Sequence, residues 1–241
     1  MRLRQIALVA HELDPTIDAL RAELGADVCF VDPGVGAFGL HNALLPLGDT
    51  FLEVVAPIED RTAAGRYLER RGGDGGYMVL LQLDEDERAA CRANADEIGI
   101  REVSQPEDTH GDVHIVGTHF HPADHGGAIL SVDTATPVGS WGWAGDGWQP
   151  VVRTERAGRI LAAELQGPDP EAMAARWGAL LGLEPIDGII AMDQSELRFV
   201  ELGDERGEGL TAIEVEAIDP LLEGRSVEVA GIRIDWVSPT A

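Results

Sequence analysis

The sequence predicts an α+β protein of tandem βαβββ units, two of them paired and a third partly completed by C-terminal strands. An apolar strand-like segment followed by an acidic residue, an amphipathic helix and a terminating glycine occurs three times. Short strand-like segments, and no further helix, follow each of these helices. Asp14, Asp84 and Asp169, which precede or open the three helices, are separated by 70 and 85 residues.

The first copy begins with a strand at residues 5–10. We expect Asp14 to cap the following helix, Pro15 to occupy its first position and Gly25 to end it in the left-handed conformation. The strands that should follow are residues 27–33, 41–48 and 50–57.

The second copy begins with a strand at residues 77–83, and Asp84 with Glu87 has the spacing of a capping box. Its helix should end at Gly99. The strands expected after it are residues 100–106, 113–122 and 126–133.

The third copy begins with a strand at residues 160–166. Its helix should start at Asp169-Pro170 and end at Gly182. The later strands are expected at residues 185–193, 196–203 and 210–217, and residues 226–237 predict one or two extra strands of a truncated fourth unit.

This pattern divides the chain into a paired-unit domain (1–137), a connector rich in Trp and Gly (138–157) and a third unit with extra strands (158–241). The connector holds Trp141, Trp143 and Trp148. Their rings either cover the edge between two domains or form a wall of a ligand cavity.

The charge balance, 18 basic against 43 acidic residues, gives a net charge of -25 and argues against nucleic-acid and anionic-membrane partners. No apolar stretch approaches the ~20 residues that span a bilayer. The N-terminal apolar run is short and lacks a small-residue cleavage site, and only two cysteines occur. We therefore expect a cytoplasmic protein without a signal peptide.

Three segments, QIALVAHELDP, TFLEVVAP and HFHPADHGGAILSVD, resemble strand motifs of the glyoxalase-like or vicinal oxygen chelate superfamily in their order and spacing. The resemblance implies that two βαβββ units curl around a cavity. It also implies four positions that can hold a divalent cation, which chelates two neighbouring substrate oxygens.

In this chain the resemblance places those four positions on Gln5, Glu53, Met78 (Tyr77 with a one-residue slip) and Ser131. Only Glu53 is a strong ligand for a hard cation. We therefore expect no four-ligand metal site and assign no cofactor. Whether a divalent metal binds in another way is left open by the sequence. Gln5, Met78 and Ser131 become candidate substrate-binding residues, together with Trp141 and Trp143.

Four of the seven histidines lie between His114 and His125, and His119 and His121 project from the same face of a strand. This pair is a candidate for binding a metal or for proton transfer. The alternative is structural: His121-Pro122 forms a turn, His125 is exposed and His119 is a hydrogen-bonded core residue. The segment THFHPADH also resembles the HxHxDH motif of metallo-β-lactamases, with one residue too many before Asp124.

Glu53 is the leading catalytic candidate, with His119 and His121. A carboxyl group that points into an apolar barrel has a raised pKa and can serve as a general base. The alternative for Glu53 is a structural ion pair with Arg4. Two further segments are expected to have structural roles, residues 70–76 as an inter-unit linker and residues 201–209 as a solvated loop.

The leading functional hypothesis is a glyoxalase-like protein that binds a small polar metabolite and abstracts a proton next to a carbonyl, as an isomerase or lyase. The sequence leaves open whether the protein is an enzyme. The second hypothesis is a non-catalytic binding or sequestering protein of the same superfamily. The third is a zinc hydrolase that uses His119, His121, Asp124 and His125. The resemblance also favours a homodimer, because unpaired βαβββ units in this superfamily dimerise.

Overall fold

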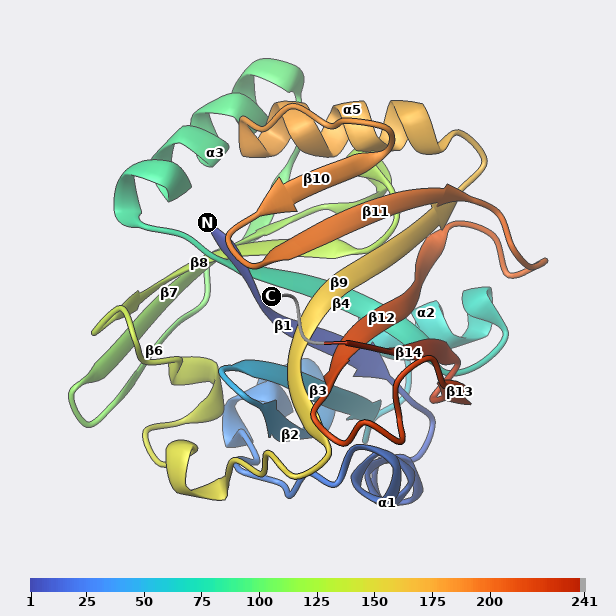
Figure 1. Ribbon diagram of the computed structural model, residues 1–241. Helices are drawn as coiled ribbons and strands as arrows, with labels where there is room; N and C mark the ends of the chain where they lie inside the picture. The colour runs from blue at the N-terminus through green and yellow to red at the C-terminus, as the bar shows by residue number, and fades with distance from the viewer. Residues whose placement is uncertain (239–241) are drawn as a thin grey trace.

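The computed structural model describes residues 1–238 and contains two β-sheets joined by a connector (Figure 1). The first sheet has the strand order β2-β3-β1-β4-β8-β7-β5, with β6 paired to β7. The second has the order β10-β11-β9-β12-β14-β13.

The first sheet consists of β1 (Arg2–Val9), β2 (Leu40–Leu47), β3 (Thr50–Pro57), β4 (Gly75–Gln82), β5 (Glu102–Ser104), β6 (Glu107–His110), β7 (Val113–Phe120) and β8 (Ile129–Thr136). The second consists of β9 (Ala157–Gly167), β10 (Ile189–Met192), β11 (Ser195–Glu201), β12 (Gly209–Ala217), β13 (Ser226–Val229) and β14 (Ile232–Val237). The α-helices are α1 (Leu13–Leu24), α2 (Ala63–Arg71), α3 (Glu85–Ile98), α4 (Pro122–His125) and α5 (Pro170–Leu181). Within residues 1–238, no helix is both long and apolar enough to cross a membrane.

The strand pairing confirms the tandem βαβββ fold class. Each unit pairs its first strand in parallel with a later one: β1 with β3, β4 with β8 and β9 with β11. The first strands of neighbouring units pair antiparallel, β1 with β4 and β9 with β12. The segment expected to close the third unit, β12, therefore opens a truncated fourth one. It pairs in parallel with β14, and a turn at residues 218–225 replaces the helix.

The helix ends largely follow the sequence signals. Asp84 and Glu87 form the complete capping box, Asp169 caps α5, and Gly25, Gly99 and Gly182 end their helices in the left-handed conformation. The predictions for Asp14 and Pro15 were wrong, because α1 begins two residues earlier than expected, at the buried Leu13, with Glu12 at the cap position. Asp14 accepts no capping hydrogen bond there.

Helix α2 was not expected from the sequence. It follows β3 within the first half of the chain, Thr62 caps it, and it buries only four residues (Ala64, Tyr67, Leu68 and Arg71). The helix has only nine residues, and three of them are arginines, so no apolar segment of helical length marks it in the sequence. In Figure 1, α2 lies at the end of β4, while α3 and α5 lie side by side over the opposite region. Asn94 of α3 donates a hydrogen bond to the carbonyl of Leu180 in α5.

Alternation along the first sheet separates an apolar face under the helices from a concave face with several polar side chains. In β1 the register shifts between Leu3 and Gln5, so Arg4 has no paired residue opposite it. Leu3 packs into the helix-side core, whereas Arg4 lies over the rings of Phe51 and Trp141 on the concave side. The bulge thus places two consecutive side chains, Arg4 and Gln5, on the concave face.

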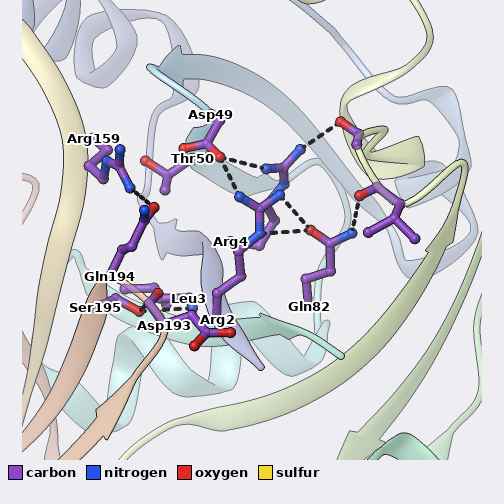
Figure 2. Close-up of polar contacts among 12 residues, drawn as sticks. Arg2, Leu3, Arg4, Asp49, Thr50, Gln82, Arg159, Asp193, Gln194 and Ser195 are labelled. Atoms are coloured by element: carbon purple, nitrogen blue, oxygen red, sulfur yellow. Dashed lines mark hydrogen bonds and ion pairs between the residues drawn. The ribbon is translucent and has the colours of Figure 1, made fainter. Parts of the chain in front are cut away.

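The start of β1 also anchors the connector that follows β8. Arg4 donates a hydrogen bond to Asp49 (Figure 2), and it also donates to the carbonyls of Gly139 and Ser140. Gln82 donates to the carbonyl of Val138 at 2.7 Å. These contacts hold the chain just before its tryptophans, which therefore pack back onto the concave face.

The capping box of α3 should contribute measurably to stability. Asp84→Ala is expected to lower the free energy of unfolding by about 1 kcal/mol more than Asp86→Ala. Both residues are exposed near the N-terminus of α3 and both substitutions remove one negative charge, but only Asp84 accepts the amide hydrogen of Glu87, at 2.8 Å. Urea denaturation measures both variants, and equal losses would contradict the capping role.

Candidate active site

The concave face of the first sheet encloses a cavity of about 350 Å³. Five of the residues predicted from the sequence line it: Gln5, Glu53, Met78, His119 and Trp143. Most of the remaining wall is apolar and includes Val35, Phe38, Val55, Leu80 and Ile129. We refer to this space as the Glu53 cavity.

Glu53 projects from β3 into this cavity and is 8% exposed. Each of its carboxylate oxygens accepts a hydrogen bond from a buried amide. Gln5 Nε2 donates to Oε2 at 2.8 Å, and Asn42 Nδ2 donates to Oε1 at 2.6 Å.

Both amides are fixed in orientation by groups that can only donate. The indole N–H of Trp141 donates to Gln5 Oε1 at 2.7 Å, and the backbone N–H of Asp32 donates to Asn42 Oδ1 at 2.8 Å. Reversing either amide would place two donors face to face. Gln5 and Asn42 must therefore present N–H groups to Glu53.

Burial raises the pKa of Glu53 to about 7, while the hydrogen bonds from Asn42 and Gln5 oppose part of that rise. The nearby charge of Asp32 raises the pKa further. The alternative in which Glu53 pairs with Arg4 is wrong, because the Arg4 guanidinium binds Asp49 at 3.3 Å. Glu53 is thus a buried carboxyl group without a cationic partner among residues 1–238.

His119 lines the same cavity from β7. Its Nδ1 is hydrogen-bonded to Ser104 Oγ at 2.9 Å. Desolvation lowers the pKa of the imidazole to about 4. The ring is therefore neutral at pH 7, with Nε2 not engaged by Ser104.

Three other predicted residues do not line the Glu53 cavity. His121 lies outside this cavity, and its Nδ1 accepts a hydrogen bond from the backbone N–H of Ala123 at 3.2 Å. Ser131 is fully buried, and Trp141 is fully buried behind Gln5. Roles for His121, Ser131 and Trp141 in contacting a ligand remain predictions.

The connector tryptophans pack on the concave face of the first sheet, and one of them lines the cavity. Trp141 and Trp148 belong to an apolar cluster on the concave face, where Trp148 packs edge-on against Phe51. Trp143 instead forms part of the cavity wall.

Asp133 is a buried carboxyl group that sequence reasoning missed. It is 0% exposed in β8 and accepts a hydrogen bond from Ser131 Oγ at 2.6 Å. Burial raises its pKa to about 7, and the Ser131 hydrogen bond opposes that rise. The available signal was its position two residues after Ser131, which puts both on the same face of the strand.

The four positions that the superfamily uses for a divalent cation do not fit one here. Gln5 turns an amide nitrogen, which is not a metal ligand, toward Glu53, and its oxygen is occupied by Trp141. Met78 offers only a thioether, and the Ser131 hydroxyl donates to Asp133. Residues 1–238 contain no group of three or more His, Cys, Asp or Glu side chains placed to hold a metal.

The zinc-hydrolase alternative is wrong. The βαβββ pairing excludes the layered sandwich that the HxHxDH motif requires. Asp124 is held by the guanidinium of Arg101 at 2.7 and 2.8 Å. His125, which was expected to be exposed in the structural alternative, is 3% exposed and packs edge-on against Trp177.

Comparisons with known proteins agree with this architecture. A family model described as a glyoxalase-like domain matches residues 6–181. No curated protein matches the chain.

Among solved structures, a hypothetical protein from Staphylococcus aureus has a TM-score of 0.68 at 12% identity, with 98% of each chain covered. A variant of Streptomyces coelicolor methylmalonyl-CoA epimerase has a TM-score of 0.49 at 24% identity, with 58% of this chain and 99% of that chain covered. Likeness at such identities concerns the fold alone.

Glu53 should make stability depend on pH. Its folded-state pKa of about 7 lies above the ordinary value of 4.5, so its contribution is fully present below pH 4.5 and is lost as the pH rises through 7. Between those limits, the free energy of unfolding of the wild type should fall by about 3 kcal/mol relative to Glu53→Gln.

Denaturant titrations at several pH values measure this difference. Asp133 is present in both proteins, so its own pH-dependent contribution to the free energy of unfolding drops out of the comparison. Glu107→Gln is the control, since Glu107 also lines the cavity but its side chain is 65% exposed. Parallel stability curves for the wild type and Glu53→Gln would contradict the raised pKa.

The space around Asp133 should tolerate no added methyl group. A Cβ on Gly117 would lie 2.4 Å from Asp133 Oδ1. We expect Gly117→Ala to cost about 1–3 kcal/mol of stability. Gly139→Ala is the matched control, because a Cβ there meets no atom within 4 Å. Thermal unfolding compares the two, and equal midpoints would show that the strand adjusts freely.

Proposed function

Because the chain belongs to the glyoxalase-like domain family of the vicinal oxygen chelate superfamily, we propose that it binds a small polar metabolite and moves a proton at a carbon next to a carbonyl. The observation that supports this most directly is Glu53, a buried carboxyl group with a pKa of about 7 that faces the cavity. A base with a pKa near the working pH combines a useful ionised fraction with sufficient proton affinity.

In the proposed step, the ionised Glu53 takes the proton from the carbon. The electron pair of the broken C–H bond moves toward the carbonyl, and negative charge develops on its oxygen. Delivery of a solvent proton to the opposite face of the enolate, with release of the abstracted proton from Glu53 to solvent, gives an isomer. Loss of a group from the neighbouring carbon would instead give a lyase reaction.

The residues around Glu53 have two further roles in this proposal. Gln5 and Asn42 hold the carboxylate in one position, so little reorganisation accompanies proton transfer. His119 is neutral and can donate a hydrogen bond from Nε2 to the developing oxyanion when Ser104 donates to Nδ1. The mainly apolar wall suits a compact molecule with a few polar groups.

No step in this proposal passes through a metal ion, because Gln5, Met78 and Ser131 do not form a ligand set with Glu53. Activity should therefore persist in the presence of EDTA. A metal requirement, with stoichiometric binding in a titration with divalent cations, would count against this arrangement.

The second candidate is a protein that binds the same class of ligand without catalysis. The mainly apolar wall favours it, since such a surface provides affinity without chemistry. Under this alternative, Glu53 serves as a hydrogen-bonding group for the ligand.

Deuterium exchange distinguishes the two candidates. A panel of small carbonyl compounds with an acidic C–H is incubated with the protein in D₂O, and NMR follows the loss of the C–H signal. We expect exchange that rises with pH around 7 and that falls by roughly 100-fold or more in Glu53→Gln. Glu107→Gln should retain the wild-type rate. Binding without exchange would support the non-catalytic role.

A further inference from the structure

A second hollow, of about 710 Å³, lies next to the Glu53 cavity. The two spaces share Ala63, Tyr77 and Ile129 in their walls. The second hollow is lined by four arginines: Arg66, Arg70, Arg71 and Arg206. We refer to it as the arginine hollow.

This concentration of positive charge contrasts with the rest of the chain. The protein has 43 acidic residues and only 18 basic ones, all of which are arginine. Four of those 18 surround one hollow. The one carboxylate in the lining, Glu208, is engaged by the backbone N–H of Gly127 at 3.0 Å. The hollow is therefore a local region of positive charge on an acidic protein.

Arg71 is the most deeply placed of the four, with an exposed fraction of 4%. Its Nη1 donates to the carbonyls of Arg206, Gly207 and Glu208 at 2.7–2.8 Å. Its Nε and Nη2 have no hydrogen-bond partner among residues 1–238. A buried guanidinium with free donors is costly unless an acceptor reaches it.

Backbone geometry holds the Arg71 guanidinium at this place. A Cβ on Gly209 would lie 2.8 Å from Arg71 Nη2, so only glycine lets the group lie against the start of β12. The guanidinium is thus preorganised by neighbours rather than drawn to a carboxylate.

Arg206 belongs to the loop at residues 201–209, which the sequence suggested was solvated. Its guanidinium instead donates to the carbonyls of Arg71, Gly73, Asp74 and Gly231. The loop is therefore docked on the linker between the first two units. Arg66 and Arg70 lie exposed on α2 at the rim, and Arg70 lies over the ring of Tyr67 at 5.1 Å.

We infer that the arginine hollow binds an oxyanion of the phosphate or carboxylate type, which the exposed rim arginines Arg66 and Arg70 recognise and the buried positive charge of Arg71 attracts. Arginine suits such groups because its planar donors match their oxygens. Since the hollow adjoins the Glu53 cavity, this anion is one end of the ligand whose carbonyl end lies at Glu53. That last assignment rests on the proposed function.

Titration with inorganic phosphate, followed by calorimetry, tests the anion site directly. The wild type should bind phosphate saturably at one site, more weakly at high salt. The double variant Arg66→Gln/Arg70→Gln should bind it about tenfold more weakly. Both residues are exposed, so the fold should be retained, which circular dichroism checks. A parallel titration with acetate separates a phosphate site from a carboxylate site.

Arg153→Gln/Arg225→Gln is the charge-matched control, because both arginines are exposed, lie outside the hollow and pair with carboxylates, Asp27 at 3.4 Å and Glu23 at 3.5 Å. It should bind phosphate as the wild type does. No saturable binding of either anion at millimolar concentrations, or equal affinity in the double variant and the wild type, would overturn the site.

Two further measurements keep the anion site separate from the proposed reaction. Glu53→Gln should retain phosphate affinity even though it loses exchange activity. Carbonyl compounds that carry a phosphate or carboxylate should have a KM about tenfold higher in the double variant, with kcat unchanged. If phosphate binds but neutral and anionic compounds respond equally to the double substitution, the shared-ligand assignment fails while the anion site stands.

Discussion

The site depends on a buried carboxylate that is held by amides instead of by a cation. Glu53 receives one N–H from Gln5 and one from Asn42, and each amide is fixed from behind by a donor, Trp141 or the backbone of Asp32. An arginine partner would have lowered the pKa of the group, whereas neutral donors stabilise the anion only in part and leave its pKa at about 7. The environment keeps Glu53 ordered without removing its affinity for a proton.

The surrounding fold serves this arrangement. The bulge in β1 brings Gln5 to the concave face beside Arg4, and Arg4 holds the carbonyls at the start of the connector. The connector then delivers Trp141 to Gln5. Arg4 thus lies at the start of the connector and the four arginines lie around the arginine hollow, while Glu53 has no cationic partner among residues 1–238. On a molecule with a net charge of -25, a local group of arginines also attracts an approaching anion to one region of the surface.

The sequence was sufficient for the repeat, because glycine, proline and capping residues act locally. The capping box at Asp84 and the glycine ends illustrate this. The sequence was insufficient where contacts between residues distant in the chain determine the bounds or the role of an element. Burial of Leu13 moved the start of α1 away from Asp14, and pairing with β9 and β14 made β12 the opening strand of a further unit. Gln5 and Glu53 could be identified from the resemblance to the superfamily's strand motifs, and His119 from the alternation of side chains along its strand. Asn42, Asp133 and Arg71 could not, since their importance comes from partners distant in sequence.

The docking of Arg206 has a consequence for how such repeated units evolve together. Four carbonyls, three from the linker between the first and second units and one from the last hairpin, converge on a single guanidinium supplied by the third unit. Duplicated modules that share a side chain in this way can no longer be inherited or exchanged independently. A gene encoding only the paired units would lack a wall of the space beside α2. The third unit thus supplies part of a wall that the paired units could not form by themselves.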